Sequence, residues 1–294
     1  MGPIFGGFLG AVDFGPDGLE SWRLIFFVIA GLGGLLWIIS LFGLKETLTR
    51  DPSEPVGCVN PVSPIAFMRY FRISTILLSL SIGFAGFFAI NISFPMILQA
   101  AYNQPTLTVG LCYLPFGVGL VIGAVVGGRS ADRMRRRGGT AEHRLLPSLL
   151  FFPLNACFIV GQGWIFDYAD SIHLSVVLIM SFFLGFTFIL PRAGVNTYVI
   201  EKLKLLEGRD LASSATGLVF GVMLPVSAII AQLSVIGFGA IGYGRFLTIV
   251  GGVLFASTIP IAIFVIRDIR KAKRNANSAG SPSSHKDVDY QAIN

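Results

Sequence analysis

Long apolar blocks alternate with short polar segments along this chain. A membrane helix needs about 20 apolar residues to cross about 30 Å of hydrocarbon. Lipid cannot hydrogen-bond to backbone groups, so blocks of this length are helices, and the ~10-residue alternating strands of a membrane barrel are not seen. An opening apolar block, 1–12, is too short to cross alone. We expect seven membrane helices, at about 24–44, 74–98, 108–128, 147–164, 174–198, 212–236 and 241–266.

The composition supports a surface that faces lipid. Hydrophobic residues make up 53% of the chain and charged residues only 13%, whereas a soluble protein carries about 25% charged residues. The net charge of +6 does not indicate a nucleic-acid partner, because the charges lie between apolar blocks and form no basic face on a soluble domain. The sequence therefore predicts an all-α, multi-pass integral membrane protein in contact with the lipid bilayer.

The basic residues predict the orientation in the membrane. Cytoplasmic loops carry an excess of Lys and Arg. Every second loop is basic, which places the basic loops and the C-terminus in the cytoplasm. There are four Lys and Arg in 45–73, six in 129–146, three in 199–211 and six after 266, but none in 99–107 or 165–173.

The polar tail, 267–294, has no apolar periodicity, and we expect it to be disordered. Its basic residues would lie near anionic lipid headgroups, which attract each charge by about 1 kcal/mol. The alternative is a flank that only sets the topology. The residues concerned are Arg267, Arg270, Lys271, Lys273 and Arg274.

Few polar residues occur inside the spans. Arg192 is the only charge well inside one, and such a charge costs roughly 2.5–3.5 kcal/mol at a helix centre. It either reaches the headgroups or a structural partner, or it faces a substrate. Asn196 lies one turn further on the same face, and Pro191 loosens the helix. Asn91 and Gln232 are interhelical hydrogen-bonding groups or ligand contacts, so the candidate substrate-binding residues are Asn91, Arg192, Asn196 and Gln232.

The sequence contains no motif of a known catalytic site, so we expect neither an enzyme nor a cofactor or metal.

Glycine pairs such as Gly123/Gly127 and Gly117/Gly119 would allow helices to approach closely. At the end of the third span, in VVGGRSADRMRRRGG, Asp132 is expected just past the helix. Its carboxylate can pair with Arg133 and Arg136 or cap the next helix, and so lock two spans together.

The segment VVGGRSADRMRRRGG resembles the loop signature of the major facilitator superfamily, with Arg135 where the family prefers glycine. The opening Gly-Pro-Ile-Phe-Gly-Gly resembles the pattern in the fifth helix of its antiporter branch. GLCYLPFGVG at 110–119 and AEHRL at 141–145 resemble fungal drug:proton antiporters. The resemblance implies a conformational gate at Gly128, Asp132, Arg133, Arg136 and Arg137, and an antiporter signature at Gly2, Pro3, Gly6 and Gly7.

The resemblance also implies how the chain is organised. Residues 1–44 would be the second half of helix five and helix six, 45–73 the central cytoplasmic loop, and 74–266 the six-helix C-terminal half of the fold, followed by the disordered tail. About four and a half helices would then be missing before Met1, and we expect an incomplete gene model or partial transcript. Such a chain would not run a full transport cycle alone.

The implied function is proton-coupled export of small amphipathic compounds across the plasma membrane by alternating access. The chain contains 26 phenylalanines, and an aromatic-rich interior suits drugs and similar amphipathic compounds. Polyamine exporters belong to the branch that the chain resembles, and Arg192 would suit an organic anion. One alternative is an inactive or regulatory half-transporter.

A more distant alternative is a seven-helix receptor, because Asp132-Arg133-Met134 ends the third full span. Against a receptor, the last span lacks an Asn-Pro-x-x-Tyr string, and 165–173 contains no cysteine to pair with Cys112.

Overall fold

A computed structural model describes residues 6–7, 20–44, 63–138, 140–207 and 212–278. Within these ranges the fold is all-α and contains no strand. Seven stretches are long and apolar enough to cross a membrane, as the sequence predicted. The stretch Thr106–Gly138 consists of two consecutive α-helices, α4 and α5. The helices are α2 (Glu20–Gly43), α3 (Phe71–Ala100), α4 (Thr106–Leu111), α5 (Leu114–Gly138), α6 (Leu146–Asp167), α7 (Leu174–Glu207), α8 (Ala212–Ile241) and α9 (Tyr243–Ser278), and the short 3-10 helices are η1 (Ser63–Arg69), η2 (Ala141–Leu145) and η3 (Ala169–Ser171).

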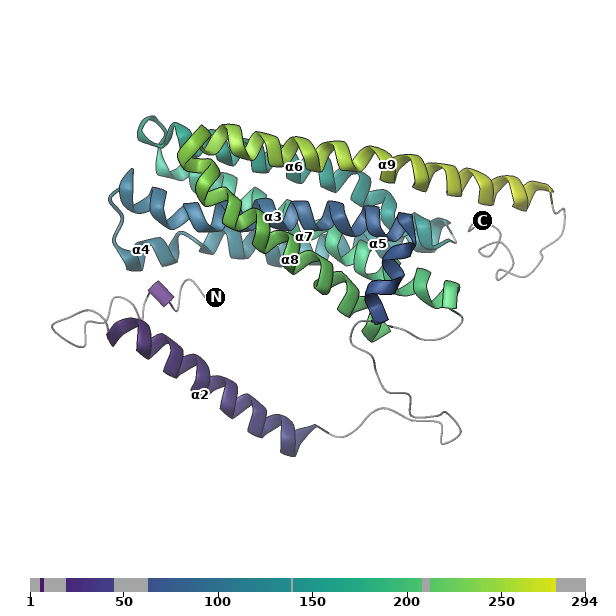
Figure 1. Ribbon diagram of the computed structural model, residues 1–294, viewed down its shortest axis with the longest axis horizontal. Helices are drawn as coiled ribbons and strands as arrows, with labels where there is room; N and C mark the ends of the chain where they lie inside the picture. Colours follow the sequence, from purple (N-terminus) through teal and green to yellow (C-terminus); the bar gives the residue numbers. More distant parts are fainter. Residues whose placement is uncertain (1–5, 8–19, 45–62, 139, 208–211, 279–294) are drawn as a thin grey trace.

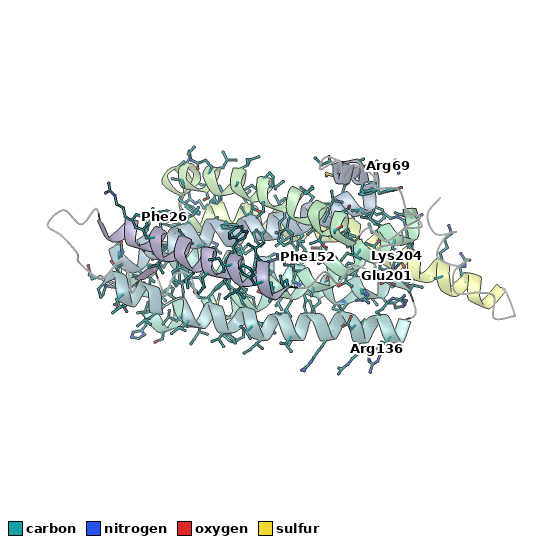
Figure 2. The ribbon with its side chains drawn as sticks, turned by 90° about the horizontal axis from the view of Figure 1, so that it is seen from below. Phe26, Arg69, Arg136, Phe152, Glu201 and Lys204 are labelled. Atoms are coloured by element: carbon teal, nitrogen blue, oxygen red, sulfur yellow. The ribbon has the colours of Figure 1, made fainter. Side chains whose placement is uncertain are left out.

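Helices α3 to α9 pack into one bundle, and α2 lies apart from it (Figure 1). None of the apolar stretch of α2 is buried, and large side chains such as Phe26 and Trp37 are mostly exposed. Figure 2 shows Phe26 on this separate helix. Burial of apolar surface is what stabilises a helix of this composition, so α2 requires lipid or another apolar surface around it.

Helix α3 lies at the centre of the bundle, where it packs against α8, α9 and α6. Its buried side chains occur on all sides of the helix, which explains why it reads as a continuous apolar run. Phe152 of α6 and Leu77 of α3 are among the largest fully buried side chains. The core therefore extends along the bundle axis, and the charged groups of the bundle gather at its two ends, with Arg192 of α7 as the exception.

A stripe of small residues joins α5 to α7. Gly119, Gly123 and Gly127 are four residues apart, so they lie on one face of α5. A Cβ atom on any of them would collide with the α7 backbone, and this close approach is what glycine permits. Gly117 faces open space, so the pair Gly123/Gly127 is confirmed as a packing pair and Gly117 is not. The α7 residues in contact are Phe182, Phe186 and Leu190.

Several helices extend beyond the predicted span ends. Helix α5 continues to Gly138, α7 to Glu207 and α9 to Ser278. The prediction of disorder from residue 267 is therefore wrong for 267–278, and residues 279–294 lie outside the described part. Arg, Lys and Ala are good helix formers, so a helix can leave the hydrocarbon and continue where water and headgroups solvate its charged side chains.

We call the end of the bundle where α5, α7 and α9 terminate the charged end, and α3 begins there as well. At the opposite end, Asp167 at the end of α6 caps α9: its two carboxylate oxygens each accept a backbone hydrogen bond of 2.8 Å, from Tyr243 and from Gly244. Gly242 makes the tight turn between α8 and α9 with φ +85°. Nearby, the Tyr102 hydroxyl donates to the Ile172 carbonyl at 2.8 Å. Burial, and then the Asp170 carboxylate, raise the pKa of Tyr102, which keeps it a donor.

Replacing Asp167 by alanine should lower the free energy of unfolding by about 1 kcal/mol, because two backbone N–H groups at the start of α9 lose their acceptor. The midpoint of thermal unfolding of the purified chain in detergent measures this effect. The control is Asp170→Ala, an exposed carboxylate at the same end that caps no helix. Equal losses in the two variants would contradict the capping role.

Candidate functional site

At the charged end, Glu201 of α7 is held by two arginines. Arg135 of α5 lies 2.6 Å from its Oε1, and Arg144 of η2 lies 3.0 Å from its Oε2. Arg144 also pairs with Asp132 of α5 at 2.9 Å. These four residues, which we call the gate cluster, connect α5, η2 and α7. Charge-assisted hydrogen bonds of this kind are strong and directional, so the cluster fixes the relative positions of the three elements.

Two further ion pairs lie beside the gate cluster. Lys202 of α7 donates to Glu142 of η2 at 2.7 Å, and both side chains are almost fully buried. Arg72 of α3 lies 2.5 Å from Asp268 of α9. Together with the gate cluster, these pairs link α3, α5, η2, α7 and α9 at one end of the bundle.

The structure corrects the predicted surroundings of Asp132. Because α5 continues to Gly138, Asp132 lies within the helix and its partner is Arg144. Arg133, Arg136 and Arg137 are exposed, and Figure 2 shows Arg136 pointing away from the bundle. The predicted pairing of Asp132 with Arg133 and Arg136 is therefore wrong. Gly128 of the same motif faces open space, and the neighbouring Gly127 makes the close contact with α7.

Four phenylalanines from α3, α5 and α7 form a continuous aromatic wall. The ring centroids of Phe87 and Phe188 are 4.4 Å apart, those of Phe84 and Phe188 are 5.1 Å apart, and those of Phe87 and Phe116 are also 5.1 Å apart. Offset contacts at these distances are favourable beyond the area that they bury. The aromatic wall thus presents a polarizable, apolar surface between helices that lie far apart in the sequence.

Arg192 lies at one end of the aromatic wall. Its guanidinium is 5.7 Å from the ring centroid of Phe84 and 5.0 Å from that of Phe220 on α8, which are cation–π distances. A cavity of about 10 Å³ beside it, lined also by Asn155 and Pro191, has the volume that one water needs. Because α7 continues to Glu207, Arg192 lies further from the helix end than the sequence indicated, and its observed partners are aromatic rings.

Asn91 lies at the other end of the wall. Its side-chain amide donates to the Phe87 backbone carbonyl at 3.2 Å, and its backbone carbonyl accepts from the Tyr113 hydroxyl at 3.2 Å. These residues and Phe116 line a pocket of about 560 Å³ that continues along one face of α5 to Ile122. This volume falls within the range of small-molecule sites.

The other two predicted binding residues are not part of this arrangement. Gln232 is exposed on α8. Asn196 is half-buried, and within the described part of the chain its Oδ1 is buried and accepts no hydrogen bond. The predicted polar patch of Arg192 and Asn196 therefore consists of neighbours on α7, of which only Arg192 is placed against the aromatic wall.

Half of the antiporter signature is described. Gly2 and Pro3 lie outside the described residues, and Gly6 has open space around it. A Cβ atom on Gly7 would lie 3.1 Å from both the Thr106 carbonyl oxygen and the Gly110 Cα of α4. Gly7 therefore packs closely against the start of the span formed by α4 and α5.

The sequence did not predict a role for the acidic partners Glu142, Glu201 and Asp268. Their basic partners Arg72, Arg144 and Lys202 were interpreted only as topology signals. A usable signal was present, because acidic residues occur within or next to the basic segments of a chain whose spans contain almost no charge. A carboxylate that packing buries in such a segment requires a cation nearby.

A family model described as Major Facilitator Superfamily matches residues 1–231. The chain belongs to this superfamily. The resemblance to the superfamily is thereby confirmed, as is the all-α membrane fold. Major facilitator proteins are transporters, and the match favours this class over an enzyme and over the seven-helix receptor.

Several curated relatives of this major facilitator protein come from fungi. The efflux pump radE of Floropilus chiversii is 27% identical over 265 residues, covering 78% of this chain and 48% of the pump. The transporter penM of Penicillium rubens is 25% identical, with 71% and 47% covered. The multidrug transporter DTR1 of Candida glabrata is 26% identical, with 70% and 40% covered. The chain spans about half the length of the curated relatives it matches.

Proposed function

We propose that the chain forms one wall of the pathway of an exporter for small amphipathic organic compounds. The observation that carries this proposal is the aromatic wall, with Arg192 at one end and the Asn91–Tyr113 hydrogen bond at the other. Aromatic faces bind the apolar part of a ligand, and few, spaced polar groups orient it. Relatives named as an efflux pump and a multidrug transporter support the export direction.

We propose further that the gate cluster acts as a lock in alternating access. The Arg144–Asp132 and Arg135–Glu201 pairs hold α5, η2 and α7 together, and a movement of η2 or of the end of α5 relative to α7 at the charged end would break them. Transporters of this kind rock one bundle against another around a midplane site. Proton coupling rests on the resemblance to the antiporter branch, and a second helical lobe would supply the other wall of the pathway.

The orientation and the membrane are also part of the proposal. The alternation of basic loops places the charged end and the C-terminus in the cytoplasm. Export of xenobiotics then places the chain in the plasma membrane. At this end, anionic lipids would meet the basic residues that follow the last span.

Ligand binding tests the site directly. In nanodiscs, the chain should bind a fluorescent amphipathic anion, and Arg192→Gln should weaken this binding about tenfold, because a charged hydrogen bond is lost. Binding of a neutral analogue of the same size should change little. Fluorescence anisotropy measures both affinities.

The matched control is Arg245→Gln, the same substitution at an exposed position near the opposite end of the bundle. Equal effects of the two substitutions, or no effect of either, would contradict the assignment of Arg192 to the site. Flux of the anion into proteoliposomes under a pH gradient separates a working exporter from an inactive or regulatory half, which would bind the ligand without moving it.

A further inference from the structure

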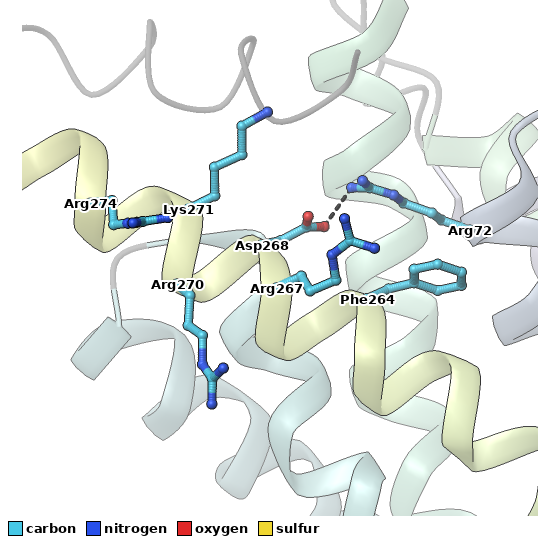
Figure 3. A pocket seen from close by; sticks show the side chains of 7 residues that line it. All are labelled: Arg72, Phe264, Arg267, Asp268, Arg270, Lys271 and Arg274. Atoms are coloured by element: carbon cyan, nitrogen blue, oxygen red, sulfur yellow. Dashed lines mark hydrogen bonds and ion pairs between the residues drawn. The ribbon is translucent and has the colours of Figure 1, made fainter.

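At the charged end, α9 and the first turn of α3 enclose a pocket of about 430 Å³ (Figure 3). Five cationic side chains and one carboxylate line it, together with a phenylalanine. Figure 3 shows them arranged around the last turns of α9. They are Arg72, Phe264, Arg267, Asp268, Arg270, Lys271 and Arg274.

Four of the five cations come from one stretch of α9. Arg267, Arg270, Lys271 and Arg274 have the spacing i, i+3, i+4, i+7, which places their Cα atoms along one arc of the helix. Figure 3 shows that the Lys271 and Arg270 side chains extend from this arc in different directions. This arc exists because α9 continues as a helix through Ser278. In a disordered tail the same residues would share no such arc.

The one carboxylate in the pocket is already engaged. Asp268 is 7% exposed and pairs with Arg72 at 2.5 Å. Arg267 and Arg270 are exposed and have no ion-pair partner among the described residues. The pocket therefore keeps an excess of positive charge that an anion with several acceptor oxygens would balance.

An apolar strip on α9 leads into this pocket. Ile259, Ile263 and Ile266 are 55%, 49% and 41% exposed, and their spacing continues the face that carries Arg270 and Arg274. Phe71 is 70% exposed and meets Phe264 edge to face at 5.9 Å. Apolar groups on the membrane side and cations at its surface match a ligand with acyl chains and a charged headgroup.

We propose that this pocket binds the phosphate-bearing headgroup of an anionic phospholipid, with its acyl chains along Ile259, Ile263 and Ile266. Arg267 and Arg270 contact the phosphate oxygens, and Arg72 holds the α3 side of the pocket in place. The inference rests on the proposed cytoplasmic orientation of the charged end. It names a defined lipid site, in contrast to general attraction of a basic tail.

Titration of the detergent-solubilised full chain with a short-chain phosphatidylinositol phosphate tests the site. We expect Arg267→Gln/Arg270→Gln to weaken binding about thirtyfold, since each cation contributes to attraction of the anionic headgroup. Short-chain phosphatidylcholine should not compete. Microscale thermophoresis gives the affinities, and the midpoint of thermal unfolding verifies that both proteins are folded.

The matched control is Arg136→Gln/Arg137→Gln, which removes two exposed cations at the same end of the bundle but outside the pocket. It should change binding less than about threefold. An equal loss in the two double variants would overturn the site in favour of general electrostatic attraction. Equal affinity for the soluble inositol phosphate would overturn the lipid in favour of a free phosphorylated ligand. These binding measurements do not require transport, so a failed transport assay would not change their outcome.

Discussion

Replacing Lys202 by methionine is expected to lower the free energy of unfolding by about 3–5 kcal/mol. The Lys202 ammonium lies 2.7 Å from Glu142 Oε1, and the two side chains are only 5% and 6% exposed. Methionine has nearly the same length but no charge, so the Glu142 carboxylate remains buried without its cation. Thermal or denaturant unfolding of the purified chain in detergent measures the loss.

The double variant Lys202→Met/Glu142→Gln should recover most of this stability. An uncharged pair of similar volume costs little, because the large penalty arises from a single buried charge. Lys204→Met is the matched control, since Lys204 is exposed on the same helix, and its effect should stay within about 0.5 kcal/mol. If the double variant is as unstable as Lys202→Met, the pairing does not explain the effect.

The spans were predictable from the sequence because their signal is local. A run of apolar residues long enough to cross lipid identifies each helix without knowledge of its neighbours. The helix ends were less predictable, because Lys202 and Arg267 lie beyond the apolar runs and still belong to α7 and α9. Hydropathy detects where the hydrocarbon ends, whereas a helix ends where its backbone hydrogen bonds end.

The ion pairs were not predictable, because their partners lie far apart in the chain. Arg144 and Glu201 are separated by 57 residues, and Arg72 and Asp268 by 196. Each of these residues lies in or beside a basic segment, where a topology signal alone accounts for the cations. Only the packing of α3 against α9, and of η2 against α7, brings each carboxylate to its cation.

The candidate site was predictable in part. Arg192 was identified because a charge inside a span is costly and therefore unusual. Its ring partners Phe84 and Phe220 were not identified, because the chain contains 26 phenylalanines and periodicity does not show which of them meet. Gln232 has the same local sequence signal as Asn91, and only the packing shows that it is exposed whereas Asn91 lines the pocket.

Gly123→Ala should lower the free energy of unfolding by about 2–3 kcal/mol. Alanine raises intrinsic helix stability by about 1 kcal/mol over glycine, but at this position its Cβ would collide with the Phe186 backbone carbonyl and lie 2.6 Å from Ile189 Cγ2. Overpacking typically costs 1–3 kcal/mol and occasionally more. The cost here lies at or above the upper end of that range, because a backbone atom cannot turn away as a side chain can. The midpoint of thermal unfolding reports the loss.

Gly128→Ala should change the free energy of unfolding in the opposite direction, although it lies on the same helix. Nothing lies within 4 Å of its Cβ position, so the gain in helix propensity is unopposed and stability should rise slightly or stay the same. The pair of variants separates close packing from glycine content, since both make the same chemical change in α5. A loss in Gly128→Ala equal to that in Gly123→Ala would show that the contact with α7 is not the cause of the loss.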